Sequence, residues 1–377
     1  MRIGILSLPL GTNYGGILQS YALLHTLHDM GHEAYVIDED KQFEYSLKRR
    51  IEMFVKGTIK RCLMGKNAII YSPTYYRKLW AARTMHTNRF VSRHTSRKMV
   101  RNMTEIGVQD FDAFVVGSDQ IWRARYARPF PGVENSFLKF TEGWNVKRLA
   151  YAASFGTDEW EYNKAETANV AAMVRMFDAI SVREVSGVGL CQKYLGVEAM
   201  CMIDPTLLLN AEDYTRLIGE DTPPSPGNMM CYVLDRSVEK DALVNDIACE
   251  KGLRPFHTNS RTEDHKATLE ERIQPPVEQW LKGFRDAEFV VTDSYHACIF
   301  SILYRKPFVV IGNKSRGMTR FESLLQVFGL EGRLVTSYED YKQKEEALLC
   351  PIDYEPVYRI LEERRTDALR FLQESLH

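Results

Sequence analysis

The sequence lacks the signals of several large classes of protein. No apolar run approaches the roughly 20 residues that a membrane-spanning helix needs, and the N-terminal MRIGILSLPLG does not have the layout of a signal peptide. The 7 cysteines form no CxxC pair, which favours reduced thiols over disulfides or a zinc site. The net charge of -1 argues against general attraction to nucleic acid. We therefore expect a cytoplasmic globular protein that binds no metal and no nucleic acid.

The length and the order of apolar segments indicate an α/β protein of two domains. A chain of 377 residues exceeds what one core usually supports, and short apolar runs alternate with helical patterns, as in doubly wound parallel sheets. The best boundary is the loop 219–228, which is rich in proline. The pattern predicts one unit over 1–218, a second over 219–350, and a charged amphipathic helix over 351–377, for which packing back on the first unit is one arrangement.

A glycine-rich turn follows the first predicted strand, Arg2 to Ser7. The turn spans 11–16 with the sequence GTNYGG, and a helix over 17–30 follows it. The spacing is not the GxGxxG of dinucleotide-binding domains. The glycines either bring the backbone close to a substrate or simply form the turn.

The balanced net charge conceals a basic block over 41–101. Roughly sixteen Lys and Arg stand there against Glu44 and Glu52. Leu47, Ile51, Phe54 and their neighbours at helical spacing predict an amphipathic helix. Such a helix binds an anionic membrane surface or an anionic ligand, or it packs on the core with a solvated basic face.

Polar residues recur where predicted strands end, which is where open α/β sheets bind ligands. The segment after Phe289–Thr292 is the most informative, because Asp293-Ser294-Tyr295-His296 leads directly into a helix. The free N–H groups of a helix N-terminus suit an anion, and an imidazole beside them suits proton transfer near neutral pH. His296 is therefore either an acid/base catalyst or a capping or core histidine.

Six motifs occur in order between about residue 1 and about residue 330: GTNYGGILQSYAL, VGSDQIW, YAASFG, ISVRE, IDPTLLL and TDSYH. Together they resemble the polysaccharide pyruvyl transferase family. The resemblance implies a GT-B-like α/β fold, in which two Rossmann-like doubly wound domains face each other across a cleft. It also implies transfer of a pyruvyl group from phosphoenolpyruvate to a sugar, as a ketal, with no further cofactor.

The donor has a phosphate and a carboxylate, so its site needs several cations or N–H donors. The resemblance places Arg183 against the donor, although an ion pair with Glu184 or another carboxylate at the domain surface is its alternative use. The family pattern carries an arginine where this chain has Ser294. Either another cation replaces that arginine or the donor is a different molecule. The predicted donor-binding residues are Arg183, Ser294, Tyr295, Lys314, Arg316 and Arg320.

The opposite domain offers groups that suit a sugar acceptor. Asp119 either accepts a proton from an acceptor hydroxyl or caps a helix, and Trp122 either contacts sugar or belongs to the core. The predicted acceptor-binding residues are Asn13, Tyr14, Gly15, Gly16, Gln120 and Trp122.

Three functions are compatible with these residues. The first is a pyruvyl transferase acting on a surface polysaccharide or glycolipid precursor, in the cytoplasm or at the inner membrane face, with His296 and Asp119 as catalytic residues. The acceptor is then a glycan that is either free or lipid-linked, and 41–101 supplies the peripheral membrane contact. The second is a glycosyltransferase that uses a nucleotide sugar on the same scaffold. The third is a non-catalytic glycan-binding protein.

Overall fold

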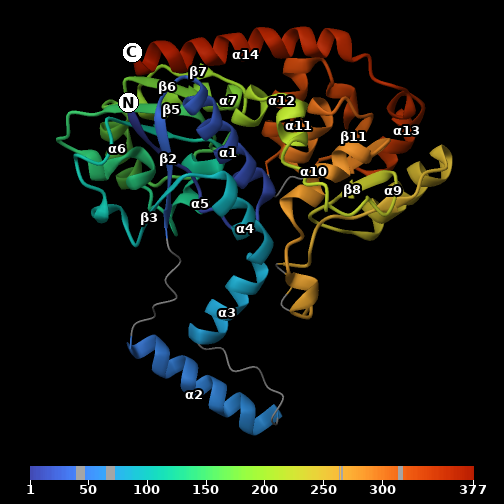
Figure 1. Ribbon diagram of the computed structural model, residues 1–377, viewed down its shortest axis with the longest axis horizontal. Helices are drawn as coiled ribbons and strands as arrows, with labels where there is room; N and C mark the ends of the chain where they lie inside the picture. The colour runs from blue at the N-terminus through green and yellow to red at the C-terminus, as the bar shows by residue number, and fades with distance from the viewer. Residues whose placement is uncertain (40–46, 65–72, 263, 265, 313–316) are drawn as a thin grey trace.

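The computed structural model describes residues 1–39, 47–64, 73–262, 264, 266–312 and 317–377, and its first unit is built on a seven-stranded sheet (Figure 1). The strand order is β3-β2-β1-β4-β5-β6-β7, and all of the pairings are parallel. Central strands such as β4 are buried along their whole length, which explains their unbroken apolar sequences. The strands are β1 (Arg2–Leu6), β2 (Glu33–Glu39), β3 (Arg97–Val100), β4 (Ala113–Val116), β5 (Lys147–Ala153), β6 (Ala179–Val182) and β7 (Met200–Cys201).

Helices cover this sheet and connect its strands. The most deeply buried is α1, which follows the glycine-rich turn and has buried residues around most of its circumference. The helices of the unit outside the basic block are α1 (Tyr14–Asp29), α5 (Ala124–Ala127), α6 (Lys164–Val174), α7 (Val185–Leu190) and α8 (Ala211–Thr215).

The second unit contains a five-stranded parallel sheet in the order β12-β11-β10-β8-β9. Its strands are β8 (Met229–Tyr232), β9 (Pro255–Phe256), β10 (Phe289–Thr292), β11 (Phe308–Ile311) and β12 (Leu334–Val335). Its helices are α9 (Val238–Lys251), α10 (Val277–Asp286), α11 (Tyr295–Leu303), α12 (Met318–Phe328) and α13 (Tyr338–Leu349). In the sequence, the loop 219–228 lies between the last strand of the first sheet and the first strand of the second. The domain limits 1–218 and 219–350 stay a prediction.

The last helix, α14 (Tyr354–Leu376), lies across both units at the top of Figure 1. Near its start, the hydroxyl of Tyr354 donates to the carbonyl of Lys306 at 2.6 Å. Further along, the buried guanidinium of Arg365 donates to the carbonyls of Leu207 and Leu209. These contacts fasten one helix to the second unit at its first turn and to the first unit beyond.

The apolar core is continuous between the units. One cluster of buried side chains includes Ile3 and Leu18 from the first unit, Trp280 and Phe300 from the second, and Leu372 from α14. The two sheets are therefore joined by packed side chains, and the cavity described below is only part of their interface.

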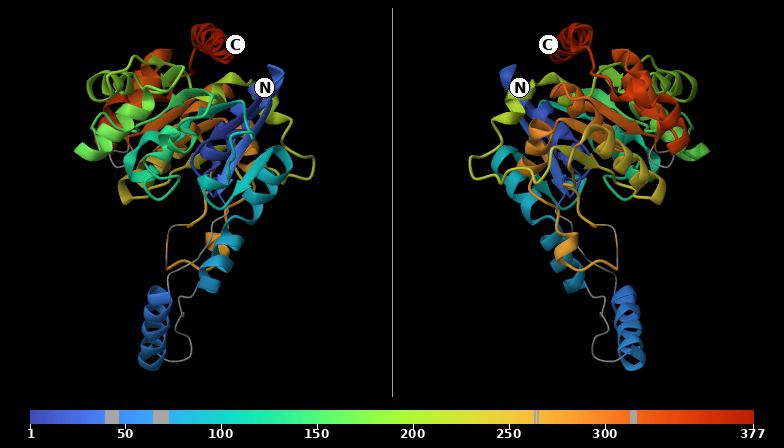
Figure 2. Two further views of the ribbon diagram at one scale, coloured as in Figure 1. Left: turned by 90° about the vertical axis from the view of Figure 1, so that its left-hand side faces the viewer. Right: turned by 90° about the vertical axis from the view of Figure 1, so that its right-hand side faces the viewer.

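The basic block has a different character from the rest of the chain. Its helices are α2 (Leu47–Met64), α3 (Pro73–Arg83) and α4 (Met85–His94). Helix α4 packs beside α1, α3 leads away from it, and α2 lies apart from the two-sheet body (Figures 1 and 2). The block ends in a strand, β3, which the prediction of a helical insertion over 41–101 did not include. None of the described helices has the length and apolar character that crossing a bilayer requires.

Candidate active site between the domains

A cavity of about 560 Å³ lies between the carboxyl ends of the two sheets. Its volume is within the range of small-molecule sites. The first unit contributes residues from the turn before α1 and from the end of β4, and the second contributes residues that follow β8, β9 and β10. The lining side chains used below are Asn13, Asp119, Gln120, Ser294, Tyr295, His296 and Arg320.

His296 lines this cavity and is almost fully buried. Ser294 is the N-cap of α11, so His296 belongs to the first turn of that helix, and its side chain is only 7% exposed. Its ring lies against the backbone of Gly15, in the first turn of α1. A Cβ at position 15 would overlap the imidazole Nδ1. The N-termini of two helices, one from each unit, therefore meet at the imidazole, and both present N–H groups and a positive dipole end.

Asp204 is the charged neighbour of His296. Its Oδ2 lies 3.5 Å from the imidazole Nε2 and accepts a 2.7 Å bond from Nη1 of Arg183. Its Oδ1 accepts from the amide and hydroxyl of Thr206. Burial by itself would raise the pKa of the Asp204 carboxyl, but His296, Arg183 and Thr206 together hold that pKa below its ordinary value. A charged Asp204 stabilises a positive charge on the imidazole, although Nε2 makes no hydrogen bond to the described residues.

Arg183 follows β6 and is paired with carboxylates. Besides Asp204, it lies 3.4 Å from Asp119 and 3.5 Å from Glu184, and its side chain is 1% exposed. Its guanidinium also lies over the Tyr295 ring, 4.3 Å from the centroid. Although burial opposes the charge, these neighbours raise the pKa of Arg183 above its ordinary value. The predicted alternative, an ion pair with Glu184, is present, and Arg183 is not among the residues that line the cavity.

Arg320, in contrast, lines the cavity. It belongs to the first turn of α12, and its guanidinium lies 5.3 Å from the centroid of the Tyr295 ring. Tyr295 is the residue that follows Ser294 in the chain. Burial, followed by repulsion from Arg183, lowers the pKa of Arg320. The N-cap of the helix is Gly317, with φ of +97°, and a Cβ there would overlap the carbonyl oxygen of Gly156 in the first unit. Lys314 and Arg316, two of the predicted donor ligands, lie outside the described residues.

Asp119, Gln120 and Asn13 form the wall of the cavity on the first unit. Asp119 has φ of +52°, in the left-handed region that is uncommon for residues other than glycine but that aspartate tolerates better than most. Its Oδ2 accepts from Nδ2 of Asn13 at 3.5 Å. Ser118, and not Asp119, is the N-cap of the short helix that follows. The Oε1 of Gln120 accepts from Arg123. Because Ser118 holds the N-cap position, the structure excludes the capping alternative for Asp119.

Three of the predicted acceptor residues are not on the cavity wall. The Tyr14 hydroxyl donates to the carbonyl of Pro275 at 2.7 Å, so Tyr14 joins the two units. The Trp122 indole is fully buried, donates to the carbonyl of Ser136 and stacks on Phe137. Gly16 lies behind the side chain of Asn13. The sequence could not distinguish these core residues from the residues that line the cavity, because both kinds follow the same strand ends.

The structure adds residues that sequence reasoning did not select. Asp204 was noted only within the motif IDPTLLL, with no partner assigned. The outer part of the cavity is formed by the segment after β9, whose two-residue strand carries almost no periodic signal. Its lining members are Asn259, Ser260, Arg261, Thr262, Asp264 and Gln274. Among the described residues, no group of three or more His, Cys, Asp and Glu is placed to hold a metal ion.

Two parallel-sheet domains with a site between their carboxyl ends define a GT-B-like protein, as predicted. A model of the family described as polysaccharide pyruvyl transferase matches residues 13–315. The chain belongs to that family, which confirms the resemblance inferred from the six motifs, and it places the chain among transferases.

Solved structures resemble this chain in fold at low sequence identity. UDP-GlcNAc 2-epimerase from Neisseria meningitidis, bound to UDP-GlcNAc, has a TM-score of 0.50 and 10% identity, with 100% of this chain and 99% of that chain covered. The corresponding epimerase from Methanocaldococcus jannaschii has a TM-score of 0.49 and 13% identity, with 96% and 99% covered. The glycosyltransferase of kitacinnamycin has a TM-score of 0.44 and 12% identity, with 100% and 99% covered. A search of curated protein sequences gave no match.

Proposed function

We propose that this protein transfers a pyruvyl group from phosphoenolpyruvate to a sugar of a polysaccharide or glycolipid precursor, as a ketal, with His296 as the acid/base. The observation that carries the proposal is the position of His296. It is buried in the wall of the interdomain cavity, where the N-termini of α1 and α11 meet, and its Nε2 lies 3.5 Å from Asp204. Proton transfer and anion binding are then available at one point.

The donor anion has two kinds of partner in this site. The N–H groups of the first turns of α1 and α11 suit the carboxylate or the phosphate. Arg320 supplies a cation near the ring of Tyr295, which follows Ser294, the position where the family pattern has an arginine. We propose that Arg320 replaces that arginine, and that Lys314 and Arg316 act with it. Arg183 then acts through Asp204, Asp119 and Tyr295, which it holds in place.

Ketal formation needs one group that donates a proton and one group that accepts protons. His296 gives its proton to the methylene carbon of phosphoenolpyruvate, which leaves an electrophilic carbon C2. A sugar hydroxyl adds to C2 and loses its proton. Phosphate then departs with the electrons of its C2–O bond, a second hydroxyl adds to C2 and loses its proton, and the ketal is complete. Of the two protons released, one restores His296 and the other is carried by phosphate. Asp119, beside Asn13 and Gln120, is the proposed base for the acceptor hydroxyl.

The same proposal covers location and cofactors. The reaction needs only phosphoenolpyruvate and the acceptor, so we propose that activity is independent of metal and of any further cofactor. Phosphoenolpyruvate is a cytoplasmic metabolite, so the proposed place of action is the cytoplasm, including the inner face of the membrane if the acceptor is lipid-linked.

Calorimetry and product analysis test the proposal. Phosphoenolpyruvate is expected to bind, and UDP or UDP-sugars are not. With glycoside acceptors, mass spectrometry is expected to detect the ketal together with released phosphate, in the presence of EDTA as well. His296→Gln should abolish product, with a loss of at least about 100-fold, and retain donor binding. The matched control is His25→Gln on α1, a half-exposed position that does not line the cavity.

The other outcomes identify the competing functions. Binding of a nucleotide sugar without phosphoenolpyruvate would support the glycosyltransferase. Glycan binding with no turnover, unchanged by His296→Gln, would support the non-catalytic protein. Full turnover by His296→Gln would remove His296 as the acid/base.

A further inference from the structure

Helix α2 exposes a complete apolar face. Five large apolar side chains at helical spacing are exposed: Leu47 by 72%, Ile51 by 54%, Phe54 by 71%, Val55 by 47% and Ile59 by 53%. Single exposed apolar residues are ordinary, but a contiguous row along one helix marks an interaction surface. In the described part of the chain, no element packs over this face.

The charge of α2 selects the kind of partner. The only carboxylate in its sequence is Glu52, whereas its basic residues are Lys48, Arg49, Arg50, Lys56, Lys60 and Arg61. A second copy of the same helix would bring like charges together, and a neutral protein groove would leave the six cations without partners of opposite charge. Basic residues around an apolar face are the pattern of helices that lie in the headgroup region of an anionic bilayer.

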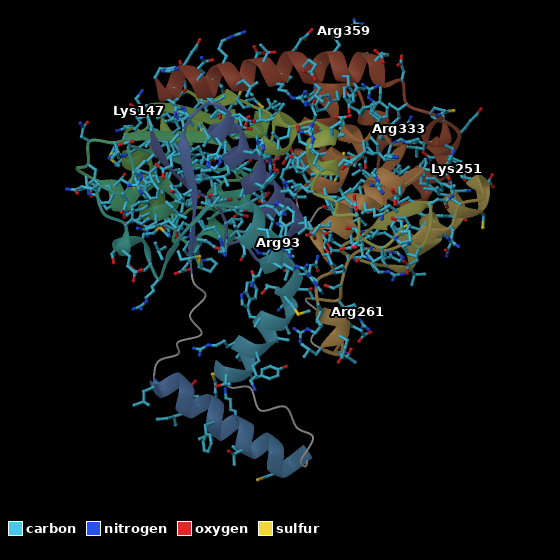
Figure 3. The ribbon with its side chains drawn as sticks, viewed as in Figure 1. Arg93, Lys147, Lys251, Arg261, Arg333 and Arg359 are labelled. Atoms are coloured by element: carbon cyan, nitrogen blue, oxygen red, sulfur yellow. The ribbon has the colours of Figure 1, made fainter. Side chains whose placement is uncertain are left out.

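The position of α2 agrees with this partner. Helix α3 connects it to the body, and the Trp80 side chain of α3 contacts Gly11 in the turn that leads to the cavity. The backbone N–H of Gln274, a residue that lines the cavity, donates to the carbonyl of Arg83 at the end of α3. Arg261, on the cavity rim, lies on the same side of the body as α3 (Figure 3). The insertion therefore projects from the same side of the two-sheet body as the segment after β9, which lines the cavity (Figures 1 and 2).

We propose that α2 docks in the plane of a membrane surface that contains anionic lipid, with Leu47, Ile51 and Phe54 entering the acyl boundary. The exposed side chains of Lys48 and Lys56 contact lipid phosphates, and Phe54 is the aromatic anchor. The cavity rim is thereby held close to the bilayer. Docking does not rest on the proposed transfer reaction, because it requires no substrate.

Vesicle sedimentation with the full chain tests the proposal. The protein is expected to sediment with phosphatidylcholine vesicles that contain phosphatidylglycerol and to stay in solution with phosphatidylcholine alone. Phe54→Glu should lower partition by about tenfold or more, because a charge replaces the deepest apolar contact. The matched control is Val238→Glu, which makes the same kind of change at a side chain that is 89% exposed on α9; it should bind vesicles normally.

Two further measurements complete the test. Raising the salt concentration several-fold should weaken binding, because screening acts on the contact of cations with headgroups. Circular dichroism should show that both variants are folded. Equal vesicle binding by Phe54→Glu and the wild type would overturn the proposal, as would absence of binding by the wild type. A dimer that Phe54→Glu dissociates, with no lipid binding, would assign the face to a second copy instead.

Discussion

The imidazole of His296 leaves no space for a side chain at position 15. Gly15→Ala places a methyl group where Nδ1 now lies, so either the ring or the N-terminus of α1 must shift. A displacement of about 1 Å at a reacting group can reduce turnover by about 100-fold. We expect that order of loss in the product assay, with the folded state retained.

Gly189→Ala is the matched control for this prediction. A Cβ at position 189, within α7, would contact nothing within 4 Å. Alanine there should leave turnover unchanged and raise the free energy of unfolding by up to about 1 kcal/mol, because it restricts the unfolded chain. Equal activity of Gly15→Ala and the wild type would mean that the imidazole is not held where the structure places it.

Asp204 gives a prediction that depends on pH. Asp204→Asn removes one partner of the buried Arg183, and we expect a loss of about 3 kcal/mol in the free energy of unfolding. The loss is at the low end for a buried pair, because Asp119 and Glu184 remain. The pKa of Asp204 is lower in the folded chain than in the unfolded chain, so its stabilisation is present above the ordinary value and lost as pH falls toward the folded value.

Urea unfolding of wild type and variant at several pH values measures this effect. The difference between them should be complete at pH 7 and shrink only below about pH 4. Asp367→Asn, at an exposed pair with Arg370, should differ from the wild type by well under about 1 kcal/mol. Turnover of Asp204→Asn should fall with a changed pH profile, because the imidazole loses the negative charge 3.5 Å from Nε2. An unchanged profile would limit Asp204 to a structural role.

At the residue scale, the sequence indicated single residues but not their partners. His296 was selected from its place after β10, and Arg183 from a motif. Their meeting through Asp204 depends on the strand order β4-β5-β6-β7, which brings residues 119, 183 and 204 to one edge. Sequence periodicity contains no information on that order, so the sequence could not identify Asp119 and Asp204 as partners of Arg183.

At the scale of elements, long periodic segments were predictable and short ones were not. Strand β10 has the predicted bounds Phe289–Thr292, and α9 spans Val238–Lys251 with a clear signal at each end. Ser237 caps α9, and Gly252 ends it with φ of +62°. In contrast, β9 and β12 have two residues each, too few for a period of two to be recognised. Strand β3 was missed because its RKMV sequence buries one residue and lies within a basic block.

The amphipathic helix α2 illustrates the limit of periodicity at this scale. The pattern predicted the helix and its apolar face, but a core-facing and a solvent-facing stripe have the same spacing. Only the arrangement in space decides between them. The exposed fractions of Phe54 and Ile51 exclude the core-packing alternative for the described part of α2.

At the scale of the whole molecule, the shared apolar cluster should make the two units unfold together. Trp280 provides the means to test this, because every other tryptophan precedes residue 219. It is fully buried in the shared cluster, and its indole N–H has no hydrogen-bond partner among the described residues. Trp280→Phe therefore removes no hydrogen bond and leaves fluorescence that reports on the first unit alone.

In this variant, fluorescence follows the first unit while far-ultraviolet circular dichroism follows the helices of both. Unfolding by urea should give coincident curves, because Tyr14, α14 and the shared cluster connect the units at many points. The midpoint should be lower than that of the wild type, since phenylalanine leaves part of the indole volume empty. Two separated transitions would mean that the cavity lies between units that fold independently. His296 and Gly15 would then be brought together by ligand, and not by the fold.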